Sequence, residues 1–197
     1  MAAKRFGPRD WIVAALAALA EGGIEAVRIE KLARRLGTSK GSFYWHFTDR
    51  PALLEAVLDF WETEGTSLVI SSADAVGSPP ERMQAVVDAA LLATEQGVDV
   101  ARTEAALRAW AAEEPVVAQR VAQVDERRVS YLAEILQRMG YDTASSRLLG
   151  VGIYLALMGL YDARRYAPSL ADDRAFRALV EGIVRSARAS ARASLTD

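Results

Sequence analysis

Apolar residues recur at helical spacing along most of the chain. A first helix has one apolar face and ends at the pair Gly22-Gly23. The residues on that face are Ile12, Ala15, Leu16 and Leu19. No strand-like alternation and no Asn-Gly or Asp-Gly hairpin signal interrupts the pattern. The sequence therefore predicts an all-α protein of about nine helices.

Two short helices follow the first one. They cover residues 29–36 and 40–47, and Gly37 stops the former. A fourth helix is expected over residues 50–75, because Pro51 is tolerated in a first turn. This helix would connect a small N-terminal domain, residues 1–50, to a larger helical domain, residues 51–197.

Helix signals continue through the larger domain. The run Ser78-Pro-Pro-Glu81 has the pattern of a capping box, and the helix that it starts is expected to reach Gly97. Further helices are expected over residues 100–112, 115–139 and 142–165, with Asp142 as the cap of the last of these. A final helix lies beyond Pro168 and Ser169.

Residues 29–47 have the spacing of a helix-turn-helix: a helix, a turn that contains glycine, and a second short helix. Gly37 relieves the backbone where the chain reverses. Phe43 and Phe47 lie four residues apart and can anchor the second helix inward. The outward surface of that helix consists of Lys40, Ser42, Tyr44, Trp45 and His46. Exposed aromatic side chains on so short a helix indicate a binding surface.

The charge of the chain is divided unevenly. Residues 1–50 carry nine Lys/Arg and five Asp/Glu, a net charge of +4. The rest of the chain carries 15 Lys/Arg and 21 Asp/Glu, a net charge of −6. A basic N-terminal domain on an acidic body suggests that this domain meets a polyanion, although chance clustering gives the same balance.

Composition excludes several kinds of chemistry. The chain has no cysteine and one histidine, His46, so disulfides, zinc–thiolate sites and multi-histidine metal sites are excluded. We expect no cofactor and no catalytic residues, since no nucleophile–base constellation is present and Asp49 is the one acid near His46.

The sequence also bears on where the protein is found, and no signal peptide is expected. The longest apolar run covers residues 148–161, short of the about 20 residues that span a membrane. The sequence therefore predicts a cytoplasmic protein that is not an enzyme and has no membrane partner.

The segment from Trp11 to about Trp61 resembles the DNA-binding domain of tetracycline-repressor-like (TetR-family) regulators. The resemblance rests on the glycine pair, the leucine–alanine helix, the run Gly37-Thr38-Ser39-Lys40-Gly41-Ser42, the aromatic run Phe43-Tyr44-Trp45-His46-Phe47, and the basic residue before Leu53-Leu54. It implies a second helix that enters the major groove of operator DNA. The DNA-contacting residues that it implies are Arg5, Arg28, Thr38, Lys40, Gly41, Ser42, Tyr44, Trp45, His46 and Arg50.

Several basic residues outside the second helix of the helix-turn-helix have different expected roles. Lys4 and Arg5 would form an arm near the minor groove or the backbone, and Arg50 would contact a phosphate. Arg28 stands where the family often has threonine or serine as a helix cap, so this arginine is expected to reach a phosphate instead. Basic residues on the preceding helix are more typical of a solvated face; they are Lys31, Arg34 and Arg35.

Residues 148–161 are apolar almost all round the helix, and such a helix must be buried on every side. A single chain of this size would struggle to bury it, whereas two copies packed together would succeed. This resembles the four-helix dimer interface of the family, and the alternative is an ordinary core helix. The predicted interface residues are Leu148, Gly152, Leu155, Gly159, Leu179 and Ile183.

The resemblance also implies an apolar pocket for an inducer in the larger domain. Candidate lining residues are Trp61, Leu91, Thr94, Trp110, Tyr131 and Met158, and the alternative is that they are plain core. The leading interpretation is a homodimeric repressor that an apolar or aromatic small molecule releases from its double-stranded operator. The alternatives are a dimeric DNA-binding protein without a ligand and, less favoured, an all-α enzyme.

Overall fold

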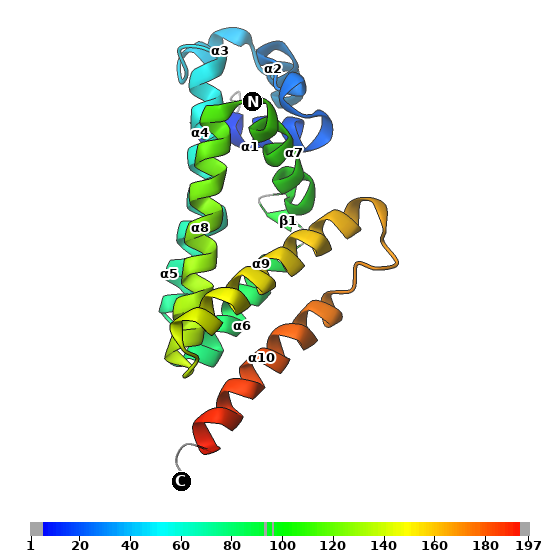
Figure 1. Cartoon of the computed structure of the whole chain (residues 1–197). Coiled ribbons are helices and arrows are strands. Elements are labelled where there is room, and N and C mark those ends of the chain that lie inside the picture. Colours follow the sequence, from blue (N-terminus) through cyan, green and yellow to red (C-terminus); the bar gives the residue numbers. More distant parts are fainter. Residues whose placement is uncertain (1–5, 93, 96, 194–197) are drawn as a thin grey trace, which may run out of the picture. The chain divides into compact units, whose positions relative to one another are not determined.

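The computed structural model describes residues 6–92, 94–95 and 97–193. Most of these residues are helical (Figure 1), and the expectation of an all-α fold is confirmed. The chain divides into two compact units, Met1–Gly65 with Ala93–Val121, and Thr66–Leu92 with Ala122–Asp197. The N-terminal domain expected over residues 1–50 lies inside the first unit, which also includes a segment from the middle of the chain.

The elements follow one another along the chain with short connections. The first unit holds α1 (Pro8–Gly22), a 3-10 turn (Ile24–Ala26), α2 (Ile29–Leu36), α3 (Lys40–Tyr44), α4 (Arg50–Glu62), β1 (Thr94–Glu95), β2 (Val98–Asp99) and α7 (Val100–Glu113). The second holds α5 (Leu68–Asp74), α6 (Pro79–Ala90), α9 (Thr143–Tyr166) and α10 (Asp173–Ala193). A π-helical segment (Thr63–Ser67) and α8 (Pro115–Arg138) each contain residues of both units.

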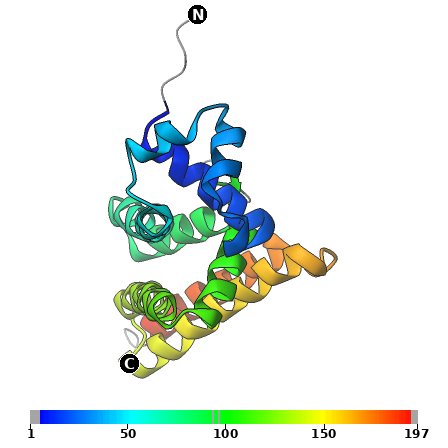
Figure 2. The ribbon, with the colours of Figure 1, turned by 90° about the horizontal axis from the view of Figure 1, so that it is seen from above.

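The core of the first unit forms around α1, which packs against α2, α4 and α7 (Figure 2). Trp11 of α1 is fully buried and meets the ring of Phe43 edge-on, with 5.3 Å between ring centroids. Phe47 stacks on Phe43 at 5.5 Å. The inward anchoring of α3 by two phenylalanines is therefore confirmed. This anchoring fixes the face of α3 that remains outside.

The core of the second unit is built from α6, α8, α9 and α10. The capping box at the start of α6 is present: the Ser78 amide donates to the Glu81 carboxylate at 2.9 Å. Asp142 caps α9 by accepting from the Ser145 amide at 3.0 Å. A Cβ on Gly150 would lie 3.2 Å from the Val129 carbonyl oxygen, so glycine lets α9 approach α8 closely at this point. Both predicted caps are therefore present at the N-termini of α6 and α9.

Two expected helix boundaries are wrong. The helix expected over residues 40–47 ends at Tyr44. The helix expected over residues 50–75 runs from Arg50 to Asp74, with the π-helical segment Thr63–Ser67 between α4 and α5. The helix expected to reach Gly97 ends at Ala90, and a small antiparallel pair of strands follows, with Thr94 opposite Asp99. Gly97 adopts a φ of 77° in the turn of this pair, a conformation that glycine favours. The backbone freedom of this glycine thus permits a tight turn instead of a helix end.

Candidate nucleic-acid interface

The second helix of the helix-turn-helix is α3, and local signals fix both its start and its orientation. Gly37 takes the left-handed conformation, with φ 67°, and ends α2. Ser39 is the N-cap of α3 and accepts from the Ser42 amide at 3.4 Å. The buried Phe43 then fixes the inward side of the helix.

The outward side of α3 brings together most of the predicted DNA contacts. Trp45 is 87% exposed and Tyr44 is 58% exposed. Lys40, Gly41 and His46 are exposed as well, whereas Thr38 and Ser42 are half-buried. This short stretch therefore presents an ammonium group, hydroxyl groups, an indole, a phenol and an imidazole on one small surface.

Two basic side chains near this surface form ion pairs with acids of neighbouring elements. Lys40 pairs with Glu30 of α2. Arg35 forms two hydrogen bonds with the Glu21 carboxylate of α1, each 2.8 Å long. The hydrogen bond from Lys40 is the main reason that the pKa of Glu30 lies below its usual value, and Arg35 has the same effect on the pKa of Glu21. Both carboxylates are therefore charged at neutral pH.

The side chains of Arg28 and Arg50 donate hydrogen bonds to backbone carbonyls of their own unit. Arg50 donates to the backbone carbonyls of Val27 at 2.7 Å and Ile24 at 2.6 Å, so it ties α4 to the loop before α2. Arg28 occupies the N-cap position of α2 without a side-chain capping bond among the described residues, and it donates to the Glu25 carbonyl at 2.9 Å. Phosphate contacts by these two arginines stay predictions, and Arg50 has a clear structural role.

His46 connects the end of α3 to the segment before α1. Its Nε2 donates to the Phe6 carbonyl oxygen at 2.9 Å, across 40 positions of sequence. Phe6 is the first residue that the structure describes, so the predicted contacts of Lys4 and Arg5 lie outside the described residues. The bond places the start of the described chain beside α3.

The six candidate pocket residues do not fall in one unit. Trp61, Thr94 and Trp110 belong to the first unit. Leu91, Tyr131 and Met158 belong to the second, where they pack in or against the hydrophobic core. A groove of about 230 Å³ between α6 and α10 is lined by other residues.

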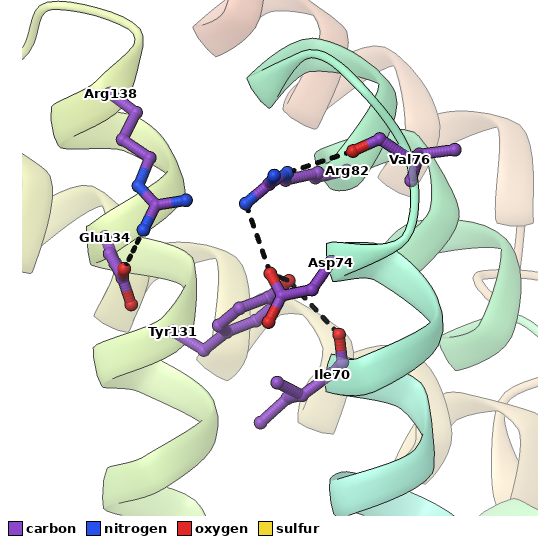
Figure 3. Close-up of polar contacts among 7 residues, drawn as sticks. All are labelled: Ile70, Asp74, Val76, Arg82, Tyr131, Glu134 and Arg138. Carbon is purple, nitrogen blue, oxygen red and sulfur yellow. Dashed lines mark hydrogen bonds and ion pairs between the residues drawn. The ribbon is translucent and has the colours of Figure 1, made fainter.

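Polar atoms of two of these candidates already have partners. The buried Trp61 donates to the Glu104 carboxylate at 2.9 Å. Figure 3 shows Tyr131 of α8 pointing toward Asp74 of α5, to which its hydroxyl donates at 2.8 Å, and Arg82 binds the same carboxylate at 3.2 Å. Burial, followed by the hydrogen bond to Asp74, raises the pKa of Tyr131 to about 12. The hydroxyl therefore stays protonated and bound to its neighbours.

A second exposed surface follows α9 and α10, which lie side by side in the second unit (Figures 1 and 2). Leu148 is 74% exposed and Leu155 is 63% exposed, and Leu179 of α10 is exposed too. A Cβ on Gly152 or Gly159 would meet no described atom within 4 Å. The predicted interface residue Ile183 is half-buried. The apolar face of α9 is thus open in the single chain, where a core helix would be covered.

The length and composition of α9 also fit a helix that crosses a membrane. Its mean hydropathy reaches 1.3, and 28% of that stretch is buried. Length and composition alone are weak evidence for a membrane span, and the helix is shared with the packed core of the second unit. The exposed apolar side of α9 is therefore a candidate for an interface.

Comparisons with known proteins identify the class. Residues 12–57 match the model of the bacterial regulatory proteins of the tetR family. The transcriptional regulator BetI of Escherichia coli K12 is 30% identical over 159 residues, which cover 78% of this chain and 79% of BetI. The class A tetracycline repressor from transposon 1721 of Escherichia coli is 37% identical over 67 residues, 34% of this chain and 31% of the repressor. The chain belongs to the TetR family.

Solved structures show the same fold. A transcriptional regulator from Saccharomonospora viridis in complex with choline matches with a TM-score of 0.76 at 16% identity, covering 90% of this chain and 95% of the other. The regulator FadR from Bacillus subtilis in complex with stearoyl-CoA matches with a TM-score of 0.67 at 18% identity, covering 90% of this chain and 98% of FadR.

The matches with the tetracycline repressor and with BetI of another Escherichia coli strain span 31% and 63% of those relatives, less than two thirds of their length.

Glu30 is the residue of this surface that the sequence pattern did not reveal. It stands ten positions before Lys40, a separation that matches no helical or strand period. The ion pair arises because the turn brings the first residues of α3 beside α2. Glu30 could have been found only by asking which acids lie near α3, the recognition helix, once the helix-turn-helix is folded.

Proposed function

We propose that the chain is a sequence-specific, homodimeric transcriptional repressor of the bacterial cytoplasm and not an enzyme. The observation that carries the proposal is the surface of α3, where the exposed Lys40, Tyr44 and Trp45 stand over the buried Phe43. Tyr44 ends this helix of five residues and Trp45 follows directly, and burial does not account for either large exposed ring. A partner that offers both polar base edges and apolar methyl groups suits them.

The recognition helix would act in the major groove of duplex DNA. Lys40, at the first position of α3, faces base edges together with Thr38 and Ser42, because the N-terminal residues of a recognition helix reach deepest into the groove. Gly41 lets the backbone approach the DNA closely. Tyr44, Trp45 and His46 follow along the phosphate backbone. Backbone contacts set the position of the helix and base contacts supply specificity.

The open face of α9 and α10 supports a homodimer. Two copies that join these faces would cover Leu148, Leu155 and Leu179, and the glycines of α9 would let the helices approach closely. A two-fold dimer presents two equivalent copies of α3, which match a pseudo-palindromic operator. The same contact explains the apolar composition of α9 without a membrane.

A small-molecule ligand is the finer part of the proposal. Two structural neighbours contain ligands, choline in one and stearoyl-CoA in the other. The bonds of Trp61 to Glu104 and of Tyr131 to Asp74 favour the alternative of a ligand-free dimer, because the polar atoms of these candidates are already used. If a ligand releases the operator, linkage requires that operator DNA weaken ligand binding by the same factor.

The test is to select duplexes from a random DNA pool with the purified protein and to sequence them, with and without a metabolite extract. The proposal predicts enrichment of one motif with two inverted half-sites, and binding that weakens steeply as salt rises. Enrichment that the extract abolishes supports a ligand, and enrichment that the extract leaves unchanged supports the ligand-free dimer. No enriched motif at any salt concentration would refute the DNA-binding proposal.

A further inference from the structure

The ion pair between Lys40 and Glu30 lies at the start of the recognition helix. Lys40 is the first residue of α3, and Glu30 is the second residue of α2. The two side chains remain 54% and 57% exposed, so the pair stands at the surface instead of being part of the core. A lysine ammonium group has three donors, and the pair leaves others free for a DNA base.

Two basic residues of α2 differ from Lys40, because they are not paired with an acid in the part of the chain that the structure describes. Lys31 and Arg34 are exposed, and neither has an ion pair or a side-chain hydrogen bond among residues 6–92, 94–95 and 97–193. Free cations of this kind attract phosphates whatever the sequence of the DNA. The domain thus holds unpaired positive charge on α2 and partly neutralised positive charge at the first position of α3.

We propose that Glu30 is a specificity-determining residue, which holds the Lys40 ammonium group away from phosphates and directs it to a base edge. This inference rests on the proposed function. An unrestrained lysine is a flexible point charge that binds the nearest phosphate, and such contacts carry no sequence information. The Glu30 carboxylate repels phosphates and keeps Lys40 beside α2. The base that suits the restrained ammonium group is guanine, which offers two acceptors in the major groove.

The test compares Glu30→Gln with the control Glu21→Gln. Both variants change the net charge by the same amount, and both remove a carboxylate that pairs with a basic residue of the helix-turn-helix. Affinities for the selected operator and for an unrelated duplex are measured at one salt concentration, and the selection is repeated with each variant. Thermal unfolding followed by circular dichroism confirms that each variant is folded.

For Glu30→Gln we expect tighter binding to unrelated DNA, and a specificity ratio that falls by roughly two- to five-fold, the scale of one exposed ion pair. One guanine position in each half-site should lose its preference. Glu21→Gln should keep the wild-type ratio and motif. An unchanged ratio in Glu30→Gln, or an equal fall in both variants, would overturn the inference.

The Lys40→Gln background shows whether Glu30 acts through Lys40. In that background, Glu30→Gln should leave the specificity ratio unchanged. A ratio that still falls would mean that Glu30 acts on DNA directly, and the inference would fail. Failure of the proposed function looks different: the wild-type protein itself would show no preference for any duplex, and the inference would fall with it.

Discussion

Two helices, α3 and α9, expose large apolar side chains, and they do so with different chemistry. At α3 the exposed residues are Tyr44, the last residue of the helix, and Trp45, its C-cap, and each ring carries a hydrogen-bonding group. On α9 they are Leu148 and Leu155, which alternate with glycines and have no polar atoms in the side chain.

The difference indicates what each surface binds. Aromatic rings with hydrogen-bonding groups suit a partner that is both polar and charged, as DNA is. A stripe of leucine and glycine suits another helix at close range, because close packing of aliphatic groups is all that it offers. In the proposed function, the α3 surface binds the polyanion and the α9 surface pairs with a second copy of the chain.

A large effect is expected on the α9 surface. Gly152→Leu and Gly159→Leu should each weaken the dimer by about 1–3 kcal/mol, because the new side chains overpack a close helix crossing. A Cβ at either position meets no described atom within 4 Å, so we expect the unfolding temperature of the free chain to change little. Sedimentation over a concentration series measures the dimer constant. Wild-type protein that sediments as a monomer at micromolar concentration would remove the basis of this prediction.

Gly150→Ala is the matched control on the other side of α9. Its new Cβ would press on the Val129 carbonyl oxygen and the Ala133 amide nitrogen, 3.2 and 3.3 Å away. This variant should lower the free energy of unfolding by on the order of 1 kcal/mol, through overpacking inside the chain. If Gly150→Ala spares stability and Gly152→Leu reduces it, the two sides of α9 have been assigned the wrong way round.

On α3, Lys40→Ala and Tyr44→Ala should each weaken operator binding by about 1–3 kcal/mol. Folding should stay intact, because both side chains are exposed. Fluorescence anisotropy with labelled operator gives the affinity, and circular dichroism gives the unfolding temperature. Full operator affinity in both variants would mean that α3 is not the surface that reads DNA.

The variant Arg50→Lys tests whether Arg50 acts mainly in the structure of the domain or mainly in contact with a phosphate. Lysine keeps the positive charge but cannot reproduce the two guanidinium bonds to Val27 and Ile24. We expect the free energy of unfolding to fall by about 1–2 kcal/mol in denaturant titrations. Unchanged stability, combined with weaker DNA binding, would favour the phosphate contact instead.

The smallest effect concerns acid sensitivity at the start of α10. Hydrogen bonds from Arg174 lower the pKa of Asp172 from 3.8 to about 2. Because the folded-state pKa is lowered, the stability that this group adds is complete above pH 3.8 and is lost as the pH falls toward 2. Asp172→Asn should lack this part of the pH dependence in thermal unfolding curves. Identical curves for both proteins between pH 5 and pH 2 would contradict the assignment.

Much of the first unit could be predicted from local signals. Glycine at position 37, leucine–alanine spacing in α2 and two phenylalanines four apart in α3 define the helix-turn-helix, since each acts within a few residues. The open side of α9, in the second unit, was also indicated by pattern, because a single chain of this size cannot bury a helix that is apolar almost all round.

Contacts between distant residues could not be predicted. The bonds of Arg50 to Ile24, and of His46 to Phe6, join positions 26 and 40 residues apart, and no periodicity encodes them. The strands Thr94–Glu95 and Val98–Asp99 are not joined by an Asn-Gly or Asp-Gly dipeptide, the strongest signal for a hairpin. The six candidate pocket residues are divided between the two units, and a pocket lined by them stays a prediction, because aromatic residues at helical spacing look alike in a core and in a cavity.

The central claim is that α3 binds operator DNA while α9 pairs with a second copy of the chain. Its most direct test is the mass of the complex on the selected operator, measured by sedimentation. The account predicts two chains on a duplex with both half-sites, whose centres lie about 10–10.5 base pairs apart or a multiple of that spacing. A duplex with one half-site destroyed should bind much more weakly. A single chain that binds one half-site with full affinity would contradict the account.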